Sequence, residues 1–203
     1  MTFDAPFAAA AERNARPILG ILSRELPADG TVLEIGSGTA QQAVVFAREL
    51  PGLRWQPTDV AENLAGIRSR LQLEHLPNIA DPLELDVQRP APDIGRYDHA
   101  YSSNTAHIMS ERAVADMFVL LGRVLRQGGL FCVYGPFRLH GQFTTESNAQ
   151  FDAALRGQDA RMGIRDLGVL DDLALAQGMR RLRLYAMPSN NLLVIWQMDR
   201  GTQ

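Results

Sequence analysis

TVLEIGSGTA, residues 31–40, is the stretch that decides the fold of this 203-residue chain. It begins as an apolar run typical of a β-strand and breaks at Gly36 and Gly38. Residues 41–50 follow, and their apolar positions recur at helical spacing. Glycine permits positive φ and lets a ligand approach closely, and the helix offers unpaired N–H groups to that ligand. The order strand, glycine turn, helix therefore predicts a nucleotide-binding site.

Two classes of nucleotide site use this geometry. The dinucleotide fingerprint G-x-G-x-x-G needs a third glycine where this chain has Gln41. The first motif of the class I S-adenosylmethionine (SAM) methyltransferases has an acid two residues before its first glycine, and Glu34 stands there. The pattern favours SAM over NAD, with a tight turn that serves packing alone as the remaining alternative.

Composition limits the kinds of partner. The length and a hydrophobic content of 46% suit one α/β domain over residues 1–203. A net charge of −3 and the lack of a basic run argue against nucleic acid, and no apolar stretch predicts a membrane span. Cys132 is the only cysteine, which excludes a cysteine-built zinc site, so we expect no metal. With a start that lacks a leader pattern, these features predict a cytoplasmic protein.

Asp59 ends the second predicted strand, residues 53–59, and lies 21 positions after Gly38. Ligands of parallel α/β sheets bind outside the carboxyl ends of the strands, and an acid at this interval can accept hydrogen bonds from ribose hydroxyls. Asp59 could also cap the next helix, residues 62–73, and the two roles are compatible.

Asp86 lies near the end of a short third strand, residues 83–87. It is placed to bond the exocyclic amine of adenine, with Leu85 and Val87 as apolar contacts. An acid is also common in a turn, so the adenine role and a turn role both stay open.

The carboxyl end of the fourth predicted strand, residues 97–104, is the expected position of the transferred group. Asn104 can contact cofactor or acceptor there, and His107 is either a general base or a polar turn residue. Strand five, residues 130–134, is continuously apolar and ends at Tyr134. A helix opening at Ser110 lies between the two strands.

The rest of the chain has three predicted features. Residues 8–26 indicate a helix that Pro17 breaks or divides in two. Residues 139–165 show no strand pattern, only a short helix at 148–155, and indicate a cover over the acceptor or a structural insertion. Strands at 179–186 and 191–199 are joined by four residues and must be antiparallel.

Several segments beyond the glycine turn carry a specific resemblance. They are EIGSGT (34–39), WQPTD (55–59), PLELDV (82–87), residues 104–108, YGPF (134–137), SN (147–148), GIRDL (163–167) and MPSNNL (187–192). On these the chain resembles the class I SAM-dependent methyltransferase-like proteins known as domain of unknown function 938. The family usually has Gly-Gln-His where this chain has Ala40-Gln41-Gln42, which weakens any catalytic role for position 42.

The resemblance implies a Rossmann-like class I methyltransferase fold: seven strands, mostly parallel, an antiparallel last strand, and helices on both faces. It implies SAM as cofactor and S-adenosylhomocysteine (SAH) as product. The expected cofactor-binding residues are Glu34, Gly36, Ser37, Gly38, Thr39, Asp59, Val60, Leu85, Asp86, Val87 and Asn104. The candidate catalytic residues are His107, Asn104 and Tyr134, and the candidate substrate residues are Arg13, Asn14, Phe137, Arg138, Arg165 and Asn190.

The resulting hypothesis is a SAM-dependent methyltransferase that acts on a nitrogen or oxygen atom of a small molecule, with a cover at residues 137–165. The alternative is a non-catalytic SAM- or SAH-binding module that acts through protein interactions. If Arg138 and Arg165 both face the cavity, an acidic acceptor becomes plausible, because arginine forks suit carboxylates. An NAD-dependent oxidoreductase is disfavoured by Gln41.

Overall fold

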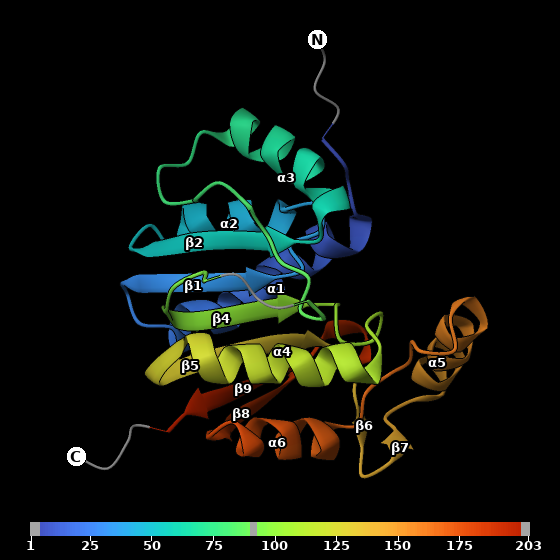
Figure 1. Ribbon diagram of the computed structural model, residues 1–203. Helices are drawn as coiled ribbons and strands as arrows, with labels where there is room; N and C mark the ends of the chain where they lie inside the picture. Colours follow the sequence, from blue (N-terminus) through green and yellow to red (C-terminus); the bar gives the residue numbers. More distant parts are fainter. Residues whose placement is uncertain (1–4, 90–92, 200–203) are drawn as a thin grey trace.

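A seven-stranded sheet forms the frame of the protein, for which a computed structural model describes residues 5–89 and 93–199 (Figure 1). The strand order is β3-β2-β1-β4-β5-β9-β8. The first five of these run parallel, and β9 is antiparallel to both of its neighbours. The strands are β1 (Gly30–Ile35), β2 (Leu53–Asp59), β3 (Leu83–Glu84), β4 (Tyr97–Ser103), β5 (Leu125–Gly135), β8 (Met179–Met187) and β9 (Asn191–Met198).

Helices pack against both faces of this sheet. On one face, α1 (Ala9–Glu25), α2 (Gln41–Glu49) and α3 (Ala61–Glu74) enclose a core around Trp55 and Tyr101. On the other, α4 (Glu111–Val124) and α6 (Leu167–Ala176) enclose a core around Phe131 and Trp196. Together with the strand order, these layers confirm the predicted mostly parallel sheet with an antiparallel last strand and helices on both faces. Among the described residues, no helix combines the length and apolar character needed to cross a membrane.

The first helix is continuous, so the break predicted at Pro17 is wrong. Proline lacks the N–H that would bond four residues back. Ile18 and Leu22, directly after it, are fully buried against the sheet. This burial offsets the lost hydrogen bond, since tertiary packing supplies most of the stability of a helix in a protein.

The prediction for residues 139–165 was incomplete. A small hairpin of β6 (Arg138–Leu139) and β7 (Gln142–Phe143) precedes α5 (Glu146–Gln158), which is longer than the predicted 148–155. His140 and Gly141 form the two-residue turn, with φ of +53° and +76°. Two positive φ values suit a tight hairpin, because that backbone twist matches the twist of paired strands. Two-residue strands are too short to show a period in the sequence.

Two strand boundaries also differ from prediction. The third strand stops at Glu84, so Asp86 lies in the loop that follows it. Strand β5 begins at Leu125, because Tyr97 pairs with Leu125 before the register shifts across an irregularity. Neither difference moves the carboxyl ends of β1, β2 and β4. Figure 1 shows α5 and the β6–β7 hairpin on the side to which the arrowheads of these strands point.

Candidate functional site

The glycine turn, residues 36–40, leaves β1 with backbone angles that favour glycine. Gly36 and Gly38 have φ of +73° and +57°, and Ala40 also lies in the left-handed region at +56°. The N–H groups of Gly36 and Ser37 both donate to the Thr58 carbonyl, at 3.0 and 2.9 Å. The turn is thereby tied to the end of β2. A Cβ at Gly36 would lie 2.4 Å from Thr105 Cγ2, so this position requires glycine.

Glu34 is buried beneath the glycine turn and holds it in shape. Its Oε2 accepts hydrogen bonds from Ser37 Oγ at 2.9 Å and from Trp55 Nε1 at 3.0 Å. Burial raises the pKa of Glu34 from 4.5 to about 7 and the charge of Asp59 adds to the rise, while the two hydrogen bonds oppose it. Glu34 therefore supports the loop through Ser37 and Trp55.

Replacing Glu34 with glutamine is expected to change how stability depends on pH. Because the folded-state pKa is raised, the folded protein keeps a proton between pH 4.5 and 7 that the unfolded chain has released. Wild-type stability therefore loses about 3 kcal/mol to this group as pH rises through that window. Glu34→Gln keeps an oxygen acceptor and cannot ionise, so its advantage over wild type should grow with pH.

Urea unfolding of the two proteins without ligand, from pH 4.5 to 8, measures this difference. The opposite trend from His107, whose pKa is lowered, occurs in both proteins and cancels in the comparison. A difference between the two that stays constant across the window would show that Glu34 does not titrate there.

Asp59 ends β2 with both carboxylate oxygens in use. Oδ2 accepts the N–H of Gly38 at 2.6 Å, and Oδ1 accepts the Val60 N–H and Asn63 Nδ2, both at 2.8 Å. The bonds to Val60 and Asn63 hold the carboxylate beside the start of α3, but the N-cap of that helix is Val60, so the capping role considered for Asp59 is wrong. A carboxylate has about four acceptor positions, so one on Oδ2 remains for a ligand hydroxyl.

A cavity of about 320 Å³ opens beside Asp59 at the carboxyl ends of β1, β2 and β4. We call it the first cavity. Its described lining residues are Ile35, Gly36, Asp59, Val60, Asn63, Leu85, Asp86, Val87, Gln88, Thr105, Ile108, Met109, Ser110, Ala113, Asp159 and Arg161. Six of the eleven residues predicted to bind a cofactor are therefore brought together here: Gly36, Asp59, Val60, Leu85, Asp86 and Val87.

The other five predicted cofactor residues are not among the described lining residues. Glu34, Ser37 and Gly38 act in or under the glycine turn, as given above. Thr39 donates from Oγ1 to Gln41 and accepts at its carbonyl from Arg70. Asn104 lies at the end of β4 with a positive φ of +56°.

One wall of the first cavity contains none of the predicted site residues. It consists of Thr105, Ile108, Met109, Ser110 and Ala113, from the β4–α4 connection and the first turn of α4, together with Asp159 and Arg161 beyond α5. Ser110 caps α4 as predicted, its Oγ accepting from the Ala113 N–H at 3.1 Å. No local pattern in the sequence indicates that the chain returns to this edge after α5.

The candidate catalytic residues do not all meet at one point. Asn104, His107 and Phe137 surround Gly135, where an added Cβ would meet each of them at 3.8 to 4.0 Å. Tyr134 belongs instead to the core under α1 and α2, and its hydroxyl accepts from Asn191 Nδ2 at 2.9 Å. Burial raises the pKa of Tyr134.

His107 is neutral in this environment. Burial, and then the positive charge of Arg165, lower its pKa to about 4. Its ring packs edge-on against Phe151 of α5, with centroids 5.3 Å apart. A neutral imidazole can accept a hydrogen bond, but a pKa this low makes it a weak base at pH 7.

The candidate substrate residues lie at several places. Arg13 is exposed and Asn14 is buried, both on α1. Asn190 is in the turn before β9, where its carbonyl accepts from Asn148 Nδ2 of α5 at 3.1 Å. Arg138 and Arg165 line a second cavity of about 120 Å³ between α4 and α6, and neither is among the described residues of the first cavity.

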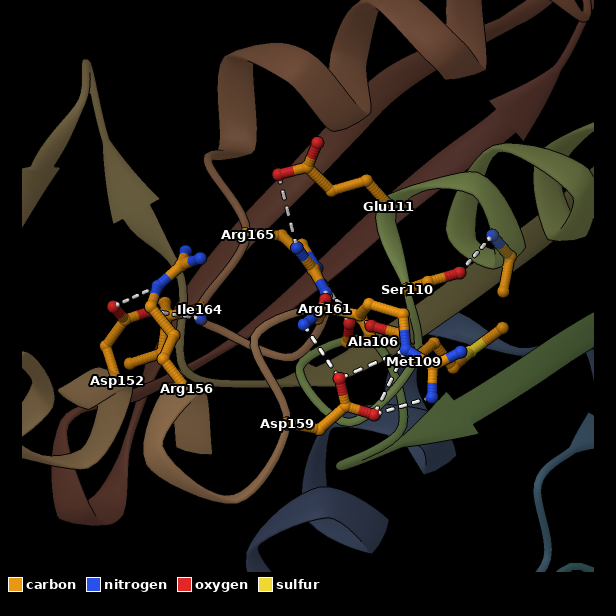
Figure 2. A network of polar contacts seen from close by, with 11 residues as sticks. Ala106, Met109, Ser110, Glu111, Asp152, Arg156, Asp159, Arg161, Ile164 and Arg165 are labelled. Atoms are coloured by element: carbon orange, nitrogen blue, oxygen red, sulfur yellow. Dashed lines mark hydrogen bonds and ion pairs between the residues drawn. The ribbon is translucent and has the colours of Figure 1, made fainter. Parts of the chain in front are cut away.

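Arg165 is the centre of a polar network between the two sides of the site (Figure 2). Arg165 is 5% exposed, and its Nε donates to the Ala106 carbonyl at 3.0 Å. One terminal nitrogen donates to the carbonyls of Met109 and Arg161, and the other faces Glu111 at 3.4 Å. Arg165 therefore acts as an anchor, and a contact with the acceptor remains a prediction.

Comparison with known proteins gives a family and a fold. The family described as "Protein of unknown function (DUF938)" matches residues 5–198. An O-methyltransferase family protein from Burkholderia thailandensis superposes with a TM-score of 0.81 at 16% identity, over 95% of this chain and 58% of that one. SAH-bound CalO1, a methyltransferase in calicheamicin biosynthesis, superposes with a TM-score of 0.73 at 23% identity, over 93% of this chain and 54% of that one.

Human N-acetylserotonin methyltransferase, solved with SAM, gives 0.78 at 15% identity, over 94% of this chain and 54% of that one. The chain thus spans little more than half the length of these solved proteins. At such identities the likeness concerns the fold, and it confirms the predicted Rossmann-like class I methyltransferase fold.

Proposed function

The chain belongs to the DUF938 family of proteins of unknown function, and we propose that it is a SAM-dependent methyltransferase that acts on a small molecule. The observation that carries the proposal is the first cavity. Gly36, Asp59 and Asp86 lie at or just after the ends of three successive strands around it, in the order that adenosyl binding requires. The similar solved structures include O-methyltransferases and complexes with SAM or SAH, and they support the same function.

The residues around the first cavity fit an adenosyl group. Its volume lies at the lower end of the range for ligand pockets. The acceptor position left on Asp59 Oδ2 suits one ribose hydroxyl. Within residues 5–89 and 93–199, the Asp86 carboxylate is engaged only by the Gln88 N–H and the mostly exposed Arg89, so it can accept from the adenine amine. Leu85 and Val87 supply apolar contact beside it.

When bound, SAM supplies a methyl group that its sulfonium already makes electrophilic. The protein then has to align the acceptor and exclude water. We assign this to Asn104 and His107 at the end of β4 and to a cover formed by residues 137–165. His107 would orient the acceptor by accepting a hydrogen bond, since its low pKa makes it a weak base. Tyr134 would act from the other face of the sheet, where its hydroxyl accepts a hydrogen bond from Asn191.

The acceptor we propose is a nitrogen or oxygen atom of a small molecule. We also propose that the protein works in the cytoplasm and binds neither nucleic acid nor a membrane. The free, buried Cys132 fits a reducing compartment. The larger proteins that share the fold have additional chain, so their acceptors are not carried over.

Calorimetric titration with SAM and SAH, followed by an SAH-release assay over metabolite pools, tests this function. Micromolar binding of both, together with SAH release in at least one pool, is the expected result. Binding without release from any pool would favour the alternative, a non-catalytic SAM- or SAH-binding interaction module. Thermal stabilisation by NAD and none by SAM or SAH would contradict both.

A further inference from the structure

The β4–α4 connection, residues 105–110, has two sides with different partners. Thr105, Ile108 and Met109 line the first cavity. The backbone on the other side is held by the segment after α5: the Gly163 N–H donates to the His107 carbonyl at 2.9 Å, and Arg165 donates to the carbonyls of Ala106 and Met109. One wall of the cavity is thus fixed by residues 159–165.

The segment 159–165 is itself held in place from both ends. Asp152 of α5 accepts the Ile164 N–H at 2.7 Å and pairs with Arg156 at 2.8 Å. Arg165 donates to the Arg161 carbonyl at 2.8 Å, so the anchor that grips the cavity wall also fixes the backbone of Arg161 (Figure 2). The position of Arg161 therefore depends on Arg165.

Asp159 and Arg161 reach the cavity as a hydrogen-bonded pair. Arg161 donates to both carboxylate oxygens of Asp159, through Nε and one terminal nitrogen, at 2.7 to 3.1 Å. Its backbone N–H donates to the same carboxylate at 2.9 Å. Hydrogen bonds from Arg161 hold the pKa of Asp159 at about 2, so the pair stays charged at neutral pH.

We propose that Asp159 and Arg161 form the outer wall of the cofactor site against the adenosyl group, with Arg165 as the residue that positions them. A planar guanidinium held by a bidentate carboxylate is suited to stack on an aromatic face. The pair shares the cavity with Asp59 and Asp86, the residues assigned to ribose and adenine. This inference rests on the proposed function and adds two binding residues to it.

The arrangement also links the cofactor site to the acceptor side. A ligand that contacts Arg161 contacts the segment 159–165. The same segment donates a hydrogen bond from the Gly163 N–H to the His107 carbonyl. His107 in turn packs on Phe151 of α5. The cover and the cofactor wall therefore form one connected unit.

Calorimetric titration of the full chain with SAH and with 5′-methylthioadenosine, which lacks the amino-acid part, tests the assignment. Arg161→Ala should weaken both ligands by about tenfold, a loss between those of an exposed and of a desolvated cation–π contact. Arg112→Ala is the matched control, because Arg112 is similarly exposed and pairs with Asp116 away from the cavity. Its affinities should equal those of wild type.

The positioning role of Arg165 is tested by combining variants. In Arg165→Lys the fork is lost and the charge kept, so adding Arg161→Ala should cost less than twofold in SAH affinity. If Arg165→Lys does not fold, Arg165→Gln takes its place, because it also removes the fork and keeps an N–H donor. A full tenfold effect of Arg161→Ala in either background would overturn the positioning role.

The outcomes separate this inference from the proposed function. If the wild-type protein does not bind SAH, both the proposed function and the outer-wall assignment are wrong. Binding by wild type with Arg161→Ala equal to Arg112→Ala would overturn the outer wall and leave the function standing. A loss confined to SAH, with 5′-methylthioadenosine unaffected, would place Arg161 at the amino-acid end and overturn the adenosyl contact.

Discussion

Asp59→Ala is expected to weaken SAH binding by about 100-fold. The substitution removes the acceptor position that the geometry leaves for a ribose hydroxyl, and a hydrogen bond to a charged group contributes about 1.5–3 kcal/mol. It also frees the Gly38 N–H, now bound at 2.6 Å, so the glycine turn loses one of its ties to β2. Each 1.4 kcal/mol is tenfold in affinity, and the two losses together give the stated factor.

The measurement is calorimetric titration with SAH, and Asp98→Ala is its matched control. Asp98 also accepts a backbone N–H, that of Thr31 at 2.8 Å, but at the opposite end of β1 from the cavity. Its loss should lower the melting temperature and leave SAH affinity within a factor of two. If Asp59→Ala binds SAH as well as Asp98→Ala does, the ribose assignment is wrong.

The features that could be predicted from the sequence are those set by local chemistry. Gly36 and Gly38 mark the turn because only glycine adopts such φ values freely, and Asp59 follows a run with clear strand character. Parallel strands bring their carboxyl ends to one edge, so motifs far apart in the chain could be placed together. One wall of the first cavity follows from these rules alone.

The second wall depends on tertiary contacts that no local pattern encodes. Arg165 bonds the Ala106 carbonyl across 59 positions of sequence, and this contact brings Asp159 and Arg161 to the cavity. An arginine after an irregular segment is equally compatible with binding an acceptor or with satisfying backbone carbonyls. Its 5% exposure supports the second role, and burial of this kind depends on the assembled fold.

Positions 40–42, where this chain differs from the usual Gly-Gln-His of the family, are also explained by tertiary contacts. Ala40 takes φ of +56° without glycine, in a fully buried position. Gln42 is buried as well, where its oxygen accepts from the Tyr101 hydroxyl at 2.9 Å and its nitrogen donates to the Ala11 carbonyl. Position 42 therefore joins α1 to the core, and the described structure uses Gln42 for packing.

Gly36→Ala is expected to lower the free energy of unfolding by about 3 kcal/mol. Positive φ costs an L-residue roughly 1–2 kcal/mol, and overpacking a tight site costs about 1–3 kcal/mol more. Both apply at Gly36, where φ is +73° and the new Cβ would lie 2.4 Å from Thr105 Cγ2. Because the turn forms part of the first cavity, SAH affinity should fall as well.

Two other glycines and one double mutant separate these causes in urea unfolding experiments. Gly38→Ala has φ of +57° with open space, so it should show only the backbone strain of about 1 kcal/mol. Gly20→Ala, inside α1 and also in open space, should stabilise by about 0.5–1 kcal/mol. Thr105→Ser removes Cγ2 and keeps the hydroxyl, so adding it to Gly36→Ala should recover about 1–2 kcal/mol. Strict additivity of the two changes would show that Thr105 is not what excludes a side chain at Gly36, and that backbone strain alone sets the requirement for glycine in this turn.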